Sequence, residues 1–140
     1  MEFFENIIPN AIAFFLPFLV GSLFFFSIVI APNVFKNLDQ KNARKFIRSI
    51  FPKLYFWSFI ISFALALLVY TKSFLLGSIL LCVSLAFLFS RQYLTPWINE
   101  VSDQVNKDEK QKKKFLILHT FSVVIFIVQV FLLTTIYFKI

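Results

Sequence analysis

The residues best suited to chemistry in this chain are a few polar side chains within apolar segments. His119, Ser122 and Gln129 lie in the last apolar stretch. If that stretch is an α-helix, with about 100° per residue, the three side chains fall within about 80° of one another. An imidazole, a hydroxyl and a carboxamide on one face can bind a polar ligand. We therefore expect this face to point into the protein.

Further polar side chains lie near the ends of other apolar segments. With the topology that the charges predict, they reach the same depth as His119, at the end that carries the basic loops. This predicts a small vestibule for an anion, a metal or a polar ligand. In the alternative, structural interpretation, Arg91 and Asn99 satisfy free carbonyls at helix ends and His119 bonds to a neighbouring backbone. The candidate vestibule residues are Asn33, Arg91, Asn99, His119, Ser122 and Gln129.

The same residues argue against catalysis. The chain has one histidine, and no carboxylate lies inside an apolar segment, so neither an acid–base pair nor a closed metal site can be assembled. We expect no enzyme activity, no catalytic residue, no metal and no cofactor. A haem or copper centre on His119 is a weaker hypothesis, because its second ligand would have to come from Met1, Cys82 or another subunit.

Charged residues divide the 140-residue chain into four apolar segments. The composition is 59% hydrophobic and 15% charged, whereas soluble domains have about 45–50% and about 25%. The four uncharged runs contain 30, 18, 18 and 24 residues, and about 20 apolar residues cross a bilayer. Each run therefore holds one crossing. We predict an all-α, single-domain bundle (1–140) of four transmembrane helices, at approximately 10–31, 54–71, 74–92 and 115–138, with cytoplasmic loops at 36–53 and 93–114.

The first loop carries its own helical pattern. Ala43, Ile47, Ile50 and Leu54 recur at the spacing of one apolar helical face. We expect an interfacial amphipathic helix between the first and second crossings, with its basic residues toward the headgroups. It meets the second crossing at Pro52, where a bend is expected.

Lysine and arginine predict the orientation. Each long loop carries six of them, and the other connections and termini share two. This bias places both loops in the cytoplasm and both termini outside, in a membrane such as the bacterial inner (plasma) membrane. The net charge of +7 therefore indicates contact with the bilayer and its anionic headgroups rather than with nucleic acid.

Small residues predict how the helices pack. They recur every four residues along the second and third crossings, as expected for closely packed helices in lipid. These two seams, joined by a tight turn at 70–73, predict an antiparallel hairpin. The candidate packing residues are Gly21, Ser58, Ser62, Ala66, Ser78, Cys82, Ala86 and Ser90.

Several short motifs resemble a known family. They are Gly21–Phe26 leading to Ala31–Phe35, Ala43 with Phe51–Tyr55, the set Arg91, Leu94, Pro96, Ile98 and Asn99, and Leu118–His119 with Ser122. In this order they resemble the TMEM205-like membrane family, known in bacteria as the DUF4149 domain. The resemblance implies four helices more than an activity, and it adds weight to Arg91, Asn99, His119 and Ser122.

Two functions are compatible with these features. The first is a small transport-associated or ligand-binding membrane protein that uses the polar vestibule. The second is a structural or accessory subunit, either a homo-oligomer or bound to a partner membrane protein through the hairpin seam or the basic interfacial helix. The sequence identifies neither the ligand nor the partner.

Overall fold

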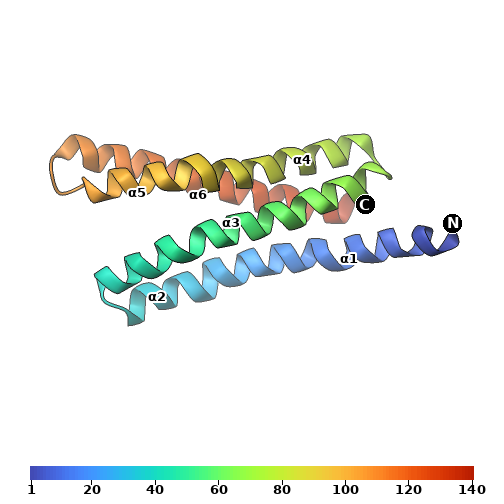
Figure 1. Ribbon diagram of the computed structural model, residues 1–140, viewed down its shortest axis with the longest axis horizontal. Helices are drawn as coiled ribbons and strands as arrows, with labels where there is room; N and C mark the ends of the chain where they lie inside the picture. Colours follow the sequence, from blue (N-terminus) through green and yellow to red (C-terminus); the bar gives the residue numbers. More distant parts are fainter.

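Four long helical segments make up the structure. The computed structural model describes residues 1–140, and only residues 38–39, 71–73 and 104–108 interrupt its helices between Glu2 and Lys139. The four segments, Glu2–Asn37, Gln40–Tyr70, Phe74–Asp103 and Glu109–Lys139, are each long and apolar enough to cross a membrane. The all-helical, four-crossing prediction is confirmed. The elements are α1 (Glu2–Phe25), η1 (Phe26–Ile30), α2 (Ala31–Asn37), α3 (Gln40–Tyr70), α4 (Phe74–Phe89), η2 (Ser90–Leu94), α5 (Thr95–Asp103) and α6 (Glu109–Lys139) (Figure 1).

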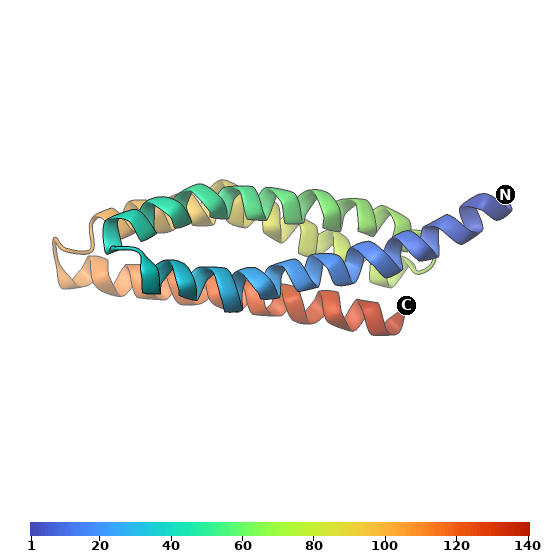
Figure 2. The same cartoon turned by 90° about the horizontal axis from the view of Figure 1, so that it is seen from below.

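The four segments pack together at the end that carries the termini, whereas the first and fourth segments lie apart at the other end. Helix α1 packs on α3 and α6, and α4 packs on α3 and α6. Both termini lie at the same end as the α3–α4 turn (Figure 2). At the opposite end α2 packs on α3 and α5 packs on α6, but no Cα of α2 or η1 lies within 8 Å of α6. The first and fourth segments therefore separate toward the end that carries the two basic connections.

Two of the segments contain a π-helical turn at matching positions. In η1 and η2 the following amide bonds five residues back, from Ala31 to Phe26 and from Thr95 to Ser90. Each turn is followed by a proline, Pro32 or Pro96. A proline has no N–H and its ring clashes with the carbonyl four residues earlier, so the wider turn lets the helix continue past it.

Three of the helices, α3, α4 and α6, begin with a side-chain cap. Asp39 accepts a hydrogen bond from the amide of Asn42, Ser73 from Leu76, and Asp108 from Gln111. Each cap satisfies one of the amides that have no partner within the first turn of a helix.

The helices extend well beyond the predicted crossings. The amphipathic residues 43–54 are helical, but they do not form a separate interfacial helix: they are the first turns of α3, and Pro52 lies inside it. Likewise, most of the predicted loop at 93–114 is helix. A 31-residue helix is about 46 Å long, which exceeds a hydrocarbon core of about 30 Å. Charges mark where the membrane ends, but lysine, arginine and glutamine favour helix and allow it to continue.

The predicted small-residue seam is correct for α3. Ser58, Ser62 and Ala66 have no exposed surface. The hydroxyl protons of both serines bond to carbonyls of α3 itself, which lets the hairpin pack closely without unpaired donors.

The seam predicted for α4 is wrong at Cys82, which is exposed. Ser78 and Ala86 are only half-buried, whereas Ser90 is buried at the far end. Residues four apart are about 400° apart around an α-helix, which is about 40° more than a full turn. From Ser78 to Ser90 these steps add up, so the four residues cannot all face the same neighbouring helix. Gly21 is also exposed, with no atom within 4 Å of where a Cβ would lie. The residues of α4 that are buried are Gly77, Leu80, Val83, Ser84 and Phe87.

Candidate functional site at the basic end of the bundle

The structure does not bring the six predicted vestibule residues together. On α6 the buried face follows Leu118, Gln129, Leu133 and Ile136. His119 lies about 100° from Leu118 around the helix, and its ring is exposed and stacked on Phe115, with centroids 5.7 Å apart. The prediction that His119 faces the interior is therefore wrong.

Ser122 and Gln129 do face the interior, as predicted. Ser122 is half-buried beside the hydroxyl of Tyr55 on α3. Gln129 is buried deeper in the bundle, where its Nε2 donates to the carbonyl of Val83, at 3.3 Å. These two residues link α6 to α3 and to α4, but at different depths.

The two asparagines take part in different hydrogen bonds. Asn33 is exposed, and its Nδ2 donates to the carbonyl of Val29 in the same helix. Asn99 is half-buried, and its backbone carbonyl accepts a bond from Arg48 at 3.2 Å. The bond made by the side chain of Asn33 is therefore local to its own helical segment.

Arg91 lies against the neighbouring helix instead of lining a vestibule. Its guanidinium carbon is 4.9 Å from the centre of the Phe56 ring on α3. One terminal nitrogen donates to Gln92, and the buried Nε has no acceptor. The cation–π contact and the stem of Arg91 join η2 to α3 near the basic end.

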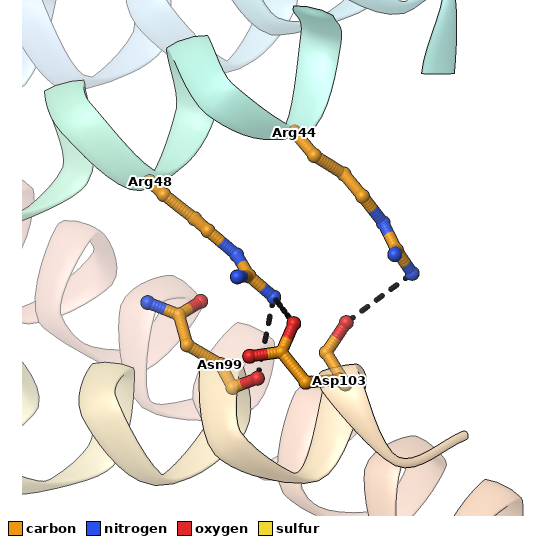
Figure 3. A network of polar contacts seen from close by, with 5 residues as sticks. Arg44, Arg48, Asn99 and Asp103 are labelled. Atoms are coloured by element: carbon orange, nitrogen blue, oxygen red, sulfur yellow. Dashed lines mark hydrogen bonds and ion pairs between the residues drawn. The ribbon is translucent and has the colours of Figure 1, made fainter. Parts of the chain in front are cut away.

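An unpredicted polar network joins α3 to α5 at this end (Figure 3). Arg44 donates to the hydroxyl of Ser102 at 3.3 Å. Arg48 donates to Oδ1 of Asp103 at 2.6 Å and to the backbone carbonyl of Asn99. The sequence predicted the basic residues of the first loop to face the headgroups and Asp103 to lie within the cytoplasmic loop 93–114. The signal that could have found the network is the i, i+4 spacing of the arginines on the α3 face that also carries buried Tyr55 and Ser62.

Next to this network, α3 forms a basic hollow. It is an open cavity of about 490 Å³, and no hydrophobic residue lines it. Four of its lining side chains are cationic; Arg48 is paired with Asp103, and the other three have no carboxylate partner, so the field of the hollow favours an anion. We call this feature the basic hollow; its residues are Gln40, Lys41, Arg44, Lys45 and Arg48.

The start of α3 contributes further to the charge pattern. The side-chain amide of Asn42, together with its backbone N–H, donates to Asp39 and holds the pKa of this exposed carboxyl below its ordinary value. Asp39 therefore stays ionised and occupied by the first turn of its own helix. The lysines of the basic hollow, Lys41 and Lys45, remain exposed.

The chemistry available at this end is therefore electrostatic binding. No three or more His, Cys, Asp or Glu side chains lie close enough together to hold a metal ion. Guanidinium and ammonium groups around an open hollow match phosphate or carboxylate groups.

Comparison with known proteins gives the family but no activity. The family model of DUF4149, a domain of unknown function, matches residues 14–107, more than half of the chain. The chain belongs to the DUF4149 family. The match includes α3, η2, α5 and therefore the whole basic hollow of this DUF4149 protein. No curated protein and no solved structure matches the chain significantly.

Proposed function

We propose that this protein binds the phosphate of anionic phospholipid headgroups in its basic hollow, with that end of the bundle on the cytoplasmic side of a bacterial inner membrane. The observation that carries the proposal is the composition of the hollow, which is lined by four cations and Gln40. Basic clusters next to membrane crossings attract anionic headgroups by about 1 kcal/mol per lysine or arginine.

The position of the hollow supports a lipid ligand. Its residues occupy the first turns of α3, ahead of the uncharged run that follows Lys53. A headgroup at this depth can meet the cations while its acyl chains stay beside the apolar part of the bundle. Arg44 and Arg48 are anchored to α5, so part of the site is already ordered before a ligand binds, which lowers the entropic cost of binding.

This role requires binding and no reaction. The side chains around the hollow bring positive charge and hydrogen-bond donors, and no nucleophile with an adjacent base. We therefore propose a ligand-binding protein of the inner leaflet and not an enzyme. A transport function would need, in addition, a polar route between the helices, and the residues of the basic hollow do not form one.

A direct test measures which lipid the purified protein retains. Native mass spectrometry would compare phosphatidylglycerol with phosphatidylcholine of the same acyl chains, released from detergent. We expect retention of the anionic lipid, and a several-fold loss when Lys41 and Lys45 are both changed to glutamine. These two lysines are chosen because their side chains make no hydrogen bond or ion pair within the protein.

A matched control separates the hollow from net charge. The double change Lys110→Gln and Lys112→Gln removes the same charge from α6, outside the hollow. Equal loss of lipid in the two double variants, or equal retention of the two lipids by the unchanged protein, contradicts the proposal. Lipid retention is also measured with inorganic phosphate added to the detergent solution. If phosphate displaces the lipid, the hollow binds any phosphate group; if it does not, binding needs the whole lipid.

A second candidate is an accessory subunit of a membrane complex. It is favoured by the separation of α2 and η1 from α6, because no Cα pair across this gap is closer than 8 Å. At the basic end α2 and η1 therefore do not pack closely on α6, which leaves room for a partner there. The same mass spectra test this role: a stoichiometric second chain supports it, and a monomer that carries only lipid opposes it.

A further inference from the structure

The carboxamide of Gln129 is the only side chain of the bundle interior whose orientation leaves a buried oxygen unpaired. The residue is 3% exposed. Its Nε2 donates to the carbonyl of Val83, and its Oε1 is buried without a donor. The orientation is fixed, because a carbonyl can only accept and therefore must face the nitrogen of the amide.

The hydroxyls of the buried serines Ser58, Ser62 and Ser84 cannot supply the missing donor. The hydroxyl of Ser62 donates to the carbonyl of Ser58, at 2.6 Å, and that of Ser84 to Leu81, at 2.8 Å. Ser58 in turn donates to Leu54. Each hydroxyl has one proton, so these oxygens can only accept further bonds. Around Gln129 the interior thus contains several acceptors, and the buried donor without a partner, Nε of Arg91, lies eight residues, about 12 Å, from Val83 along the helix.

The register of the helices brings these acceptors to one level. Phe56 contacts Arg91, and Tyr70 bonds to Ser78, so residues of α3 and α4 whose numbers sum to about 147 or 148 lie opposite each other. By this register Val83 faces residues 64 and 65. Ser62 lies two to three residues, about 3–4.5 Å, from that level along the helix axis, and Ser84 is the next residue after Val83.

We propose that Gln129 Oε1, Ser62 Oγ and Ser84 Oγ form a binding site for one water molecule in the middle of the bundle. A water molecule has two O–H donors and can therefore donate to two of these three oxygens at a time. Buried waters occur where two to four polar groups converge. A metal cation or ammonium would meet no counter-charge, since no buried residue is acidic. The water joins α6 to α3 and α4 at mid-membrane depth.

Such a site would select the position of α6. The interface of α6 beyond Gln129 toward its carboxyl end is mainly apolar, with Leu133 and Ile136 in the main core. Apolar contacts in lipid tolerate sliding and rotation, whereas a hydrogen-bonded polar group in hydrocarbon pairs in only one register. The water site therefore sets where α6 docks, independently of lipid binding in the basic hollow.

The experiment measures magnetisation transfer from water to the Gln129 side-chain amide protons by NMR, with the protein in lipid nanodiscs. A cross-peak from water to these protons is expected despite their depth. It should weaken strongly in the double variant Ser62→Ala and Ser84→Ala, whose helical circular dichroism serves as the check on folding. Absence of the cross-peak in the unchanged protein overturns the proposal.

Thermal unfolding provides a second, independent measurement. Gln129→Met replaces the carboxamide by an apolar group of similar size. If water satisfies Oε1, this change lowers the Tm; if Oε1 is truly unpaired, removal of a buried unpaired group raises it, which contradicts the proposal. Gln111→Met, at the exposed start of α6, controls for the substitution itself. Both measurements are repeated in N-methylglucamine buffer without sodium or potassium. If the cross-peak or the higher Tm is lost there, the site binds a cation and not water, which contradicts the proposal.

Discussion

At Gly77 the backbone of α4 approaches Tyr70 so closely that no larger side chain fits. A Cβ on this residue would lie 2.7 Å from Cγ of the Tyr70 ring and 3.0 Å from its backbone Cα. The same tyrosine donates or accepts a bond with Ser78, at 2.9 Å, so the ring cannot move away without a further loss. The tight turn between the second and third crossings depends on this contact.

The first prediction concerns this glycine. Gly77→Ala should destabilise the protein by about 1–3 kcal/mol, the usual cost of forcing an extra group into a packed interface. The measurement is thermal or denaturant unfolding in detergent. Gly21→Ala is the control: a Cβ there meets nothing within 4 Å, and the better helix propensity of alanine should stabilise by about 0.5–1 kcal/mol. Similar effects of the two changes would show that the turn does not rely on Gly77.

The second prediction concerns the cap of α3. The pKa of Asp39 is lowered, chiefly by the side-chain amide of Asn42, so its carboxylate stabilises the fold above the unfolded-state pKa. This contribution should be lost as the pH falls below about 4, through the lower folded-state pKa. Asp39→Asn keeps a neutral cap. The Tm difference between the unchanged protein and this variant should shrink between pH 6 and pH 3, and a constant difference would contradict the role of the charge.

At the scale of elements, two arginines attach α3 to α5. Both partners of the ion pair between Arg48 and Asp103 retain solvent access, with 34% and 59% of their side chains exposed, so the pair contributes little stability by itself. Its bond to the carbonyl of Asn99 and the bond of Arg44 to Ser102 make a network with fixed geometry. We infer that the network orders α5 and the wall of the basic hollow.

The third prediction tests that network. Arg48→Gln should increase deuterium uptake over the amides of α5, because the end of this helix loses its attachment. Asp103→Asn should do the same, and the double variant should add less than the sum of the two. Lys53→Gln is the control, since Lys53 is exposed and lies outside the network. Additive effects of the two changes would mean that the pair is not coupled in solution.

The sequence predicted the elements better than their ends or their neighbours. Uncharged runs located all four crossings, because lipid requires long apolar helices whatever their packing. It did not predict that α3 begins at Gln40, since charge density does not stop a helix that has a good cap at Asp39. It also missed the turns η1 and η2, which carry the first and third segments past the predicted ends at residues 31 and 92.

The structure does not bring the predicted vestibule residues together, and the basic hollow consists of other residues. The basic hollow lies in the first turns of α3, at the end of the bundle that carries the basic connections. The prediction that His119 faces the interior was wrong, because the angle around a helix shows which side chains share a face but not which of them contact a neighbouring helix. The long side chains of Arg44 and Arg48 reach partners more than 50 residues away in the sequence. Such contacts depend on the register between helices, which a single sequence does not contain.

At the scale of the whole molecule, the proposal depends on the membrane side that the basic end faces. The α1–α2 and α4–α5 segments run toward this end, and α3 and α6 return from it, so both termini lie at the other end (Figures 1 and 2). The connection of residues 104–108 and the start of α3 share the basic end with the hollow. If this end is cytoplasmic, it meets the anionic leaflet.

The decisive measurement is the labelling of single cysteines in intact cells by a reagent that cannot cross the membrane. In a chain whose Cys82 is replaced by alanine, one variant carries Asn106→Cys in the α5–α6 connection and another carries Thr71→Cys in the α3–α4 turn. Our account predicts that Thr71→Cys reacts in intact cells and that Asn106→Cys reacts only after the membrane is permeabilised. The reverse pattern, or reaction of both in intact cells, would contradict it.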